Sequence, residues 1–273
     1  MKEFQGHWGL ITGASSGIGE EFARRLAERG MNLILAARRE DRLKALAEEL
    51  SQANGIQTKI IAVDLLADGE PAGLVAKVAD LGHPIELLVN NAGFGLMSRL
   101  DDTNLDEVQR MLALNVSVLT ALTYAILPNM LARQSGAIVN IASLAAFQPV
   151  VYMPAYGATK SYVLHFSESL WAEARQRNVL VMAVCPGFTK TEFFDVAGMT
   201  GWYTKFAQTS QEVVAISIKA LRRRRPFVVC GRLNWLTSLL PRFVSRRMIV
   251  VGSEAMMRPP KKQTEQDESA NGN

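Results

Sequence analysis

Residues 8–19 read WGLITGASSGIG, and this stretch decides how the chain folds. The apolar run 8–12 is typical of a buried strand, and residues 20–29 follow a helical pattern. Glycines between a strand and a helix let the backbone approach a pyrophosphate, and the helix N-terminus adds free N–H groups and a favourable dipole. The stretch therefore predicts an anion site. A glycine loop alone also fits a tight turn, and the spacing Gly-x3-Gly-x-Gly differs from the commoner Gly-x-Gly-x2-Gly.

Strand and helix patterns alternate beyond this loop. Short apolar runs are separated by amphipathic stretches, which is typical of βαβ crossovers and a parallel sheet. We therefore expect an α/β fold, a Rossmann-type doubly wound parallel β-sheet flanked by helices, as a single domain over residues 1–231. Further strands are expected at 32–36, 58–63, 85–89, 137–141, 179–184 and 227–230, and further helices up to residue 50 and at 71–81, 104–133, 156–177 and 211–221.

Polar or glycine-containing segments come at the ends of four predicted strands. They are Asp64-Leu65, Asn90–Gly93, Ala142-Ser143 and Pro186–Thr189. The carboxyl ends of parallel strands share one edge of the sheet, and ligands bind at that edge. We therefore expect these segments to surround one site.

Two arginines, Arg38 and Arg39, follow the second strand, about twenty residues beyond the glycine loop. An NAD-binding unit carries an acidic residue there for the ribose 2′-hydroxyl, whereas NADP sites place an arginine nearby. Glu40 and Asp41 come later, where they suit the first turn of the next helix. The pattern predicts NADP(H); the alternative is that both arginines are solvated surface charges.

Tyr156 and Lys160 are four residues apart on a predicted helix, so their side chains share a face. A free tyrosine has a pKa of about 10, and an ammonium roughly 4 Å away stabilises the phenolate by on the order of 4 kcal/mol at an effective dielectric of about 20. That would lower the pKa towards about 7 and make the phenol a general acid or base. The spacing is common, so an ordinary surface helix is the alternative. Asn115, inside the apolar stretch 111–122, must be paired or functional.

Together these motifs resemble the short-chain dehydrogenase/reductase family in order and spacing, over roughly residues 6–230. The resemblance implies that Tyr156 is the catalytic acid, giving a proton to the carbonyl oxygen in reduction and taking it back in oxidation. Lys160 would lower the tyrosine pKa and hydrogen-bond the nicotinamide ribose. Ser143 would hold the substrate oxygen, and Asn115 would anchor a water that links Lys160 to solvent.

The resemblance also assigns cofactor contacts. Asp64 and Leu65 match positions that contact adenine, Asn91–Gly93 match the lining of the cofactor cleft, and Pro186-Gly187 with Thr189 match positions beside the nicotinamide. Many NADP-dependent members have a basic residue before the second glycine, where this chain has Ser16. The expected cofactor-binding set is Gly13, Ser15, Ser16, Gly17, Ile18, Gly19, Arg38, Arg39, Asp64, Leu65, Asn91, Ala92, Gly93, Tyr156, Lys160, Pro186, Gly187 and Thr189.

The segment from Glu192 to Phe206 corresponds in this family to a mobile lid over the substrate. Its aromatic residues favour a bulky, lipophilic substrate: a ketone, aldehyde, 3-oxoacyl or steroid-like molecule. Packing of the lid onto its own core would explain the same residues. The lid aromatics are Phe193, Phe194, Trp202, Tyr203 and Phe206, and Phe147, Val150 and Val151 are expected on the opposite wall.

Composition limits the remaining possibilities. The chain has 273 residues, 48% hydrophobic and 21% charged, which suits one large domain or at most two. Cys185 and Cys230 lie in apolar runs and are expected to be reduced thiols of a cytoplasmic protein. The three histidines form no ligand cluster, so no metal is expected. No signal peptide is expected, because the first residues run at once into a strand-like segment. No uninterrupted apolar run reaches the roughly 18 residues of a membrane span.

Positive charge is concentrated at the C-terminal end. Residues 222–273 carry 11 Lys and Arg against 4 Asp and Glu, whereas the preceding residues carry 19 against 22. Residues 232–250, in an extension expected over 232–257, read as a basic amphipathic helix that would lie on an anionic membrane, cover the domain or meet a partner subunit. Arg222–Arg225 end a helix, where positive charge suits the dipole, so nucleic-acid binding is not expected. Residues 258–273 are expected to be disordered.

The family resemblance also implies association as a homodimer or homotetramer through the helices 104–133 and 156–177. A different class of function, a non-catalytic NADP(H)-binding redox sensor or scaffold, can use the same fold. Such proteins often lose the tyrosine or the lysine, and this chain keeps both. We therefore expect an enzyme.

Overall fold

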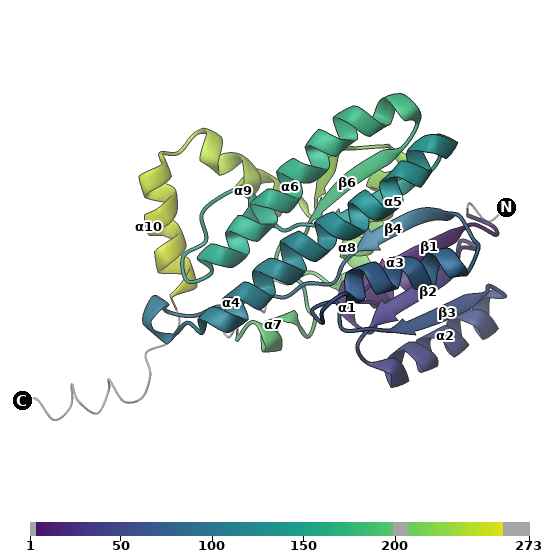
Figure 1. The fold of residues 1–273 in the computed structure, drawn as a ribbon. Helices are drawn as coiled ribbons and strands as arrows, with labels where there is room; N and C mark the ends of the chain where they lie inside the picture. The colour runs from purple at the N-terminus through teal and green to yellow at the C-terminus, as the bar shows by residue number, and fades with distance from the viewer. Residues whose placement is uncertain (1–3, 199–206, 259–273) are drawn as a thin grey trace, which may run out of the picture.

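A computed structural model describes residues 4–198 and 207–258, and its central element is one parallel sheet of seven strands in the order β3-β2-β1-β4-β5-β6-β7 (Figure 1). The strand order reverses beside β1, which is the doubly wound arrangement expected from the sequence. The strands are β1 Trp8–Thr12, β2 Asn32–Ala37, β3 Thr58–Ala62, β4 Ile85–Asn90, β5 Ala137–Ile141, β6 Leu180–Cys185 and β7 Phe227–Val229.

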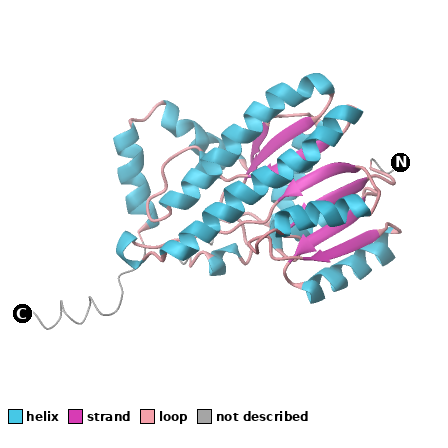
Figure 2. Cartoon of the chain, in the orientation of Figure 1, coloured by secondary structure: helices cyan, strands magenta, loops and turns pink. Residues whose placement is uncertain are grey.

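Helices cover both faces of the sheet (Figure 2). Their bounds are α1 Gly17–Ala27, α2 Glu40–Asn54, α3 Glu70–Asp80, α4 Leu105–Leu112, α5 Leu119–Arg133, α6 Pro154–Ala174, α7 Phe193–Val196, α8 Ser210–Arg222, α9 Arg232–Leu239 and α10 Arg246–Met257. Alternate strand residues point to opposite faces. Thus Ile11 packs in a core with α1, α2 and α8, whereas its neighbour Leu10 packs in a second core with α3, α5 and α6.

The expected long helix at 104–133 contains an irregularity. A π-helical segment, Ala113–Val118, separates α4 from α5. Each π turn changes the hydrogen-bonding pattern of the backbone, and such segments often occur at functional sites. The segment contains Asn115, the polar residue that the sequence placed in an apolar stretch.

The continuous helical run Leu105–Arg133 is apolar and long enough to cross a membrane by length and composition, with a mean hydropathy of 1.7. The sequence has no uninterrupted apolar run of that length here, so a helix of this kind was not expected. In the fold, Leu122, Ile126 and Met130 of this run pack against the sheet as part of the second core.

The C-terminal region differs from the single amphipathic helix expected over 232–250. It forms two helices, α9 and α10, joined through a 3-10 turn at Leu240–Arg242. Pro241 lies in that turn and cannot donate a backbone hydrogen bond to continue α9. The Ser245 side chain then caps α10 by accepting a hydrogen bond from the Met248 N–H. Residues 259–273, where disorder was expected, lie outside the described part of the chain.

Candidate active site

The carboxyl ends of the strands open into a cavity of about 850 Å³. Residues from the loops after β1 to β6 line it, and α9 and α10 contribute to its wall. The structure therefore brings together nearly all of the expected site. The expected residues that line the cavity are Gly13, Ser15, Ser16, Gly17, Ile18, Arg38, Arg39, Asp64, Leu65, Asn91, Ala92, Gly93, Ser143, Tyr156, Lys160, Pro186, Gly187 and Thr189.

Two further expected residues, Gly19 and Asn115, do not line the cavity but contact residues that do. Gly19 packs against Asn91. The Asn91 amide donates to the carbonyl oxygens of Thr12 and Gly13, both at 3.0 Å. A Cβ on Gly19 would lie 2.4 Å from that amide nitrogen, and one on Gly13 would lie 2.8 Å from it. Gly13 also has a φ of +64°, in the region that favours glycine. Glycine is therefore required at both positions for the loop to close on Asn91.

Tyr156 and Lys160 lie side by side on α6, at the inner end of the cavity. Both are buried, at 8% and 7% exposure. The Lys160 Nζ lies 5.7 Å from the centre of the Tyr156 ring and donates a hydrogen bond to the Ile141 carbonyl oxygen at 2.8 Å. Ser143, two residues beyond the end of β5, lines the same part of the cavity. The geometry groups one phenol, one ammonium and one hydroxyl at a single point, so the surface-helix alternative for this pair is wrong.

The electrostatics of this group differ from the sequence-based argument. Burial raises the pKa of Tyr156 to about 12, and the hydrogen bond with Ser143 only partly opposes it. Burial also lowers the pKa of Lys160 to about 8. The expectation of a tyrosine pKa near 7 is therefore wrong for this structure, because it counted the attraction of the ammonium and omitted the desolvation of both groups.

Asn115 links the loop after β4 to the helix that carries Tyr156. Its Oδ1 accepts from the Phe94 N–H at 3.1 Å, and its Nδ2 donates to the Phe94 carbonyl oxygen at 2.9 Å. Nδ2 also donates to Thr159 Oγ1 at 3.2 Å, and that hydroxyl donates to the Tyr156 carbonyl oxygen at 2.7 Å. The buried amide is thus fully paired and fixes two walls of the cavity.

The outer end of the cavity is positively charged. Arg39 donates to the hydroxyl groups of Ser15, at 3.1 Å, and Ser16, at 2.8 Å. The Glu192 carboxylate bridges Arg39, at 2.8 Å, and Arg42, at 2.5 Å. The sequence analysis missed Arg42 as part of the site and treated Glu192 only as part of the lid. The position of Arg42 three residues after Arg39, in the first turns of α2, is the signal that would have placed its guanidinium nearby.

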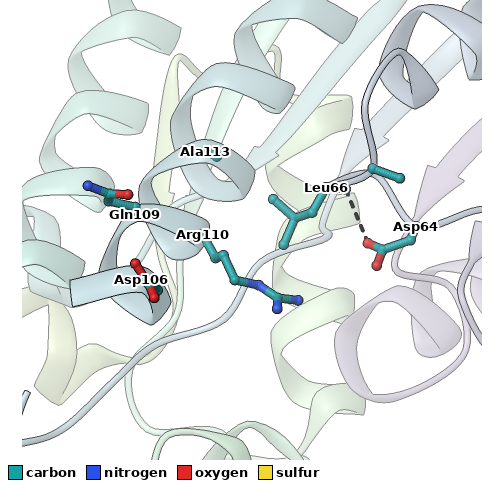
Figure 3. A pocket seen from close by; sticks show the side chains of 7 residues that line it. Asp64, Leu66, Asp106, Gln109, Arg110 and Ala113 are labelled. Atoms are coloured by element: carbon teal, nitrogen blue, oxygen red, sulfur yellow. Dashed lines mark hydrogen bonds between the residues drawn. The ribbon is translucent and has the colours of Figure 1, made fainter. Parts of the chain in front are cut away.

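A smaller cavity of about 540 Å³ adjoins this region, between α4 and the segment after β3 (Figure 3). The Asp64 carboxylate accepts a hydrogen bond from the Leu66 N–H at 3.1 Å. Arg110 extends from α4 towards that segment (Figure 3). Because Asp64, Leu66 and Arg110 line both cavities, the smaller one continues the larger.

The remaining wall of the large cavity is mostly apolar. Phe193 packs 5.5 Å from Tyr156, ring centre to ring centre, and Phe194 packs 6.4 Å from Phe188. Two expected wall residues are elsewhere. Phe147 packs against Phe227 in a separate core. Val151 does not line the cavity, and its N–H donates a hydrogen bond to the Ser253 hydroxyl of α10 at 3.0 Å.

The sequence missed part of this apolar wall, which comes from the C-terminal helices through Leu233, Thr237, Met256 and Met257. Val150, by contrast, lines the cavity as expected. The lid aromatics Trp202, Tyr203 and Phe206 lie outside the described residues.

Comparison with known proteins agrees with this arrangement. The family model for short chain dehydrogenases matches residues 7–199. The chain therefore belongs to the short-chain dehydrogenase family, and is an oxidoreductase that binds a nicotinamide cofactor and acts on CH–OH groups.

Among curated proteins, the chain is 35% identical over 191 residues to a very-long-chain 3-oxoacyl-CoA reductase of Bos taurus, covering 68% of this chain and 61% of that protein. Among solved structures, a short-chain dehydrogenase from Sphingobium yanoikuyae in complex with NADPH has a TM-score of 0.77 and 31% identity, over 94% of this chain and 97% of that one. A bulky-bulky ketone specific alcohol dehydrogenase from Comamonas testosteroni has a TM-score of 0.74 and 28% identity, over 94% and 95%.

Proposed function

We propose that the protein is an NADP(H)-dependent oxidoreductase that interconverts a lipophilic carbonyl compound and its alcohol by hydride transfer. The observation that carries the proposal is the grouping of Ser143 with the buried Tyr156 and Lys160 at the inner end of one large cavity. The outer end of the same cavity is lined by Arg39, and Arg42 lies next to it, paired with Glu192 of the lining. An extended molecule with an anionic end and a reactive end fits between them.

The chain's residues fit a nicotinamide dinucleotide. The loop from Gly13 to Gly19 forms a cradle at the N-terminus of α1, and side chains at Gly13 or Gly19 would disrupt it. NADPH bound there would supply the hydride. Arg39 with the Ser15 and Ser16 hydroxyls would hold the 2′-phosphate, which supports a preference for NADP(H) even though a serine stands where many NADP-dependent members have a basic residue.

At the inner end of the cavity, Ser143, Tyr156 and Lys160 would transfer the proton and bind the substrate oxygen. Tyr156, with a pKa of about 12, is protonated at neutral pH and so can donate a proton to the oxygen as negative charge develops there. The Ser143 hydroxyl would donate a second hydrogen bond to that oxygen. Lys160 would stabilise the phenolate that forms, and the pairing of Asn115 with Thr159 would keep α6 in position.

The apolar wall supports a lipophilic substrate. Phe193, Phe194, Met256 and Met257 line the cavity, together with Leu233 of α9. A related protein is named for 3-oxoacyl-CoA and another for bulky ketones, which points to the same substrate class.

The assay that tests this function follows NADPH oxidation, with NADH in parallel, over long-chain 3-oxoacyl thioesters, steroid ketones, retinal and small aldehydes. Turnover should prefer NADPH and the bulky substrates. Tyr156→Phe should reduce turnover at least about a hundredfold, because the proton donor is lost, while NADPH binding stays nearly unchanged. A variant that retains a tenth of the wild-type rate would rule out the role of Tyr156. Tight NADPH binding without turnover on any carbonyl would favour a redox sensor or scaffold.

We also propose that the outer surface of α9 and α10 contacts an anionic membrane. Trp235 and Phe243 are exposed at 52% and 83%, and Arg246 and Arg247 begin α10. A symmetric pairing of two such basic surfaces would be repulsive, whereas anionic lipid is complementary in charge. The protein should co-sediment with vesicles that contain anionic lipid, and Phe243→Ser with Arg246→Glu and Arg247→Glu should weaken this severalfold. Unchanged co-sedimentation of the variant would refute the contact. Association of two or four copies through α4–α5 and α6 is a separate proposal, which a measurement of the molecular mass in solution would test.

A further inference from the structure

We infer that Glu192 competes with the cofactor 2′-phosphate for Arg39 and Arg42, and so limits how strongly the protein prefers NADP(H) over NAD(H). This inference rests on the proposed NADP(H) function. It concerns one carboxylate that lies about 150 residues away in sequence from the arginines it contacts.

The contacts of Glu192 resemble those of a bound anion. Its two carboxylate oxygens accept from different guanidinium groups, Oε2 from Arg39 Nη1 at 2.8 Å and Oε1 from Arg42 Nη1 at 2.5 Å. The remaining donors of Arg39 point to the hydroxyl groups of Ser15 and Ser16. The Glu192 carboxylate thus lies between two guanidinium groups, one of which also donates to two hydroxyl groups, and guanidinium groups are the partners that a phosphate monoester prefers.

The carboxylate is ionised at neutral pH. The hydrogen bond from Arg42, followed by that from Arg39, lowers the pKa of Glu192 to about 2. A phosphate brought to the same guanidinium groups must therefore displace a negative charge or accept it as a close neighbour. Either arrangement weakens phosphate binding relative to a site without the carboxylate.

The position of Glu192 connects this contact to the rest of the cavity. It immediately precedes α7, whose first residue, Phe193, packs 5.5 Å from the ring of Tyr156. Thr191, on the other side of Glu192, packs closely against the glycine loop. A Cβ added to Gly17 would lie 3.0 Å from the Thr191 side chain. Residues 191–193 thus contact the glycine loop, the arginines and the tyrosine in succession.

The experiment measures dissociation constants of NADPH, NADH, 2′,5′-ADP and 5′-ADP by calorimetry for the wild-type protein and Glu192→Gln. Removing the charge should tighten NADPH and 2′,5′-ADP about fivefold, the size expected for half-exposed ion pairs, and change NADH and 5′-ADP less than about twofold. Asp195→Asn is the matched control, because it removes an exposed carboxylate from α7, the short helix that Glu192 precedes, and it should change none of the four.

The outcomes separate this inference from the function it rests on. If neither the wild-type protein nor Glu192→Gln binds NADPH and 2′,5′-ADP more tightly than NADH and 5′-ADP, the NADP(H) proposal itself is wrong. If the wild-type protein prefers the phosphorylated ligands and Glu192→Gln leaves that preference unchanged or weakens it, only the competition is wrong. An equal effect of Asp195→Asn would mean that general charge, rather than the contact of Glu192, sets the affinity.

Discussion

Different effects control the pKa values at the two ends of the cavity. At the inner end, Tyr156 and Lys160 are buried at 8% and 7% exposure, and desolvation dominates their pKa values. At the outer end, the side chains of Arg39 and Glu192 are 39% and 44% exposed, and paired charges dominate. Burial makes ionisation costly at the end where we propose that a proton is transferred, whereas exposure keeps ionic partners exchangeable at the end where we propose that the cofactor phosphate binds. Variants at each end should therefore fail in different measurements.

The largest effect is expected at the buried end, as a change in how stability depends on pH. The folded pKa of Lys160, about 8, lies below the ordinary value of 10.5, so the unfolded chain binds more protons between these values. The cost of burying the ammonium is therefore fully present below pH 8 and disappears as the pH rises to 10.5. In Lys160→Met this pH-dependent cost is absent. The stability of wild type relative to the variant should rise by on the order of 2 kcal/mol across that window.

Urea unfolding at several pH values between 7 and 10 measures this difference directly. The lost hydrogen bond to the Ile141 carbonyl shifts the two curves by a constant amount and does not alter the slope. A difference between wild type and variant that stays constant over the whole range would mean that Lys160 is not desolvated in solution.

A smaller effect, on affinity, is expected at the exposed end. Arg39→Leu removes the donor to Ser15, Ser16 and the proposed phosphate, and should weaken NADPH binding about tenfold while changing NADH binding less than about twofold. The loss should decrease at high salt, because exposed charges are screened. Fluorescence titration at two ionic strengths measures both. Equal weakening of NADPH and NADH binding would show that Arg39 stabilises the glycine loop and does not bind the phosphate.

Much of the fold was predictable because it depends on local periodicity. The seven strands lie where short apolar runs predicted them, with boundaries displaced by one or two residues at most. The same pattern predicted that Ser143 and Gly187, which are far apart in sequence, meet at one edge of the sheet, and the family resemblance added Tyr156 to them. The chain's membership of the short-chain dehydrogenase family agrees with the order of its motifs.

Other features depended on contacts that no local pattern contains. Phe147 was expected in the cavity wall and packs against Phe227 instead, because both the wall and that separate core attract aromatic residues. The C-terminal helices line the cavity through Met256 and Met257, although their sequence indicated only a basic amphipathic surface. The bridge from Glu192 to Arg42 joins segments whose common location follows only from the folded chain.

The sequence by itself determined the parallel α/β architecture, the edge at which the site lies and the residues that gather there, because hydrophobic periodicity and strand direction are properties of the chain. Only the tertiary structure decided the electrostatics of that site. The pKa of Tyr156 depends on how completely neighbouring elements exclude water, and the pairing of Glu192 depends on which distant guanidinium groups come within hydrogen-bonding distance. Both are set by three-dimensional packing, which the order of the residues specifies only through the fold.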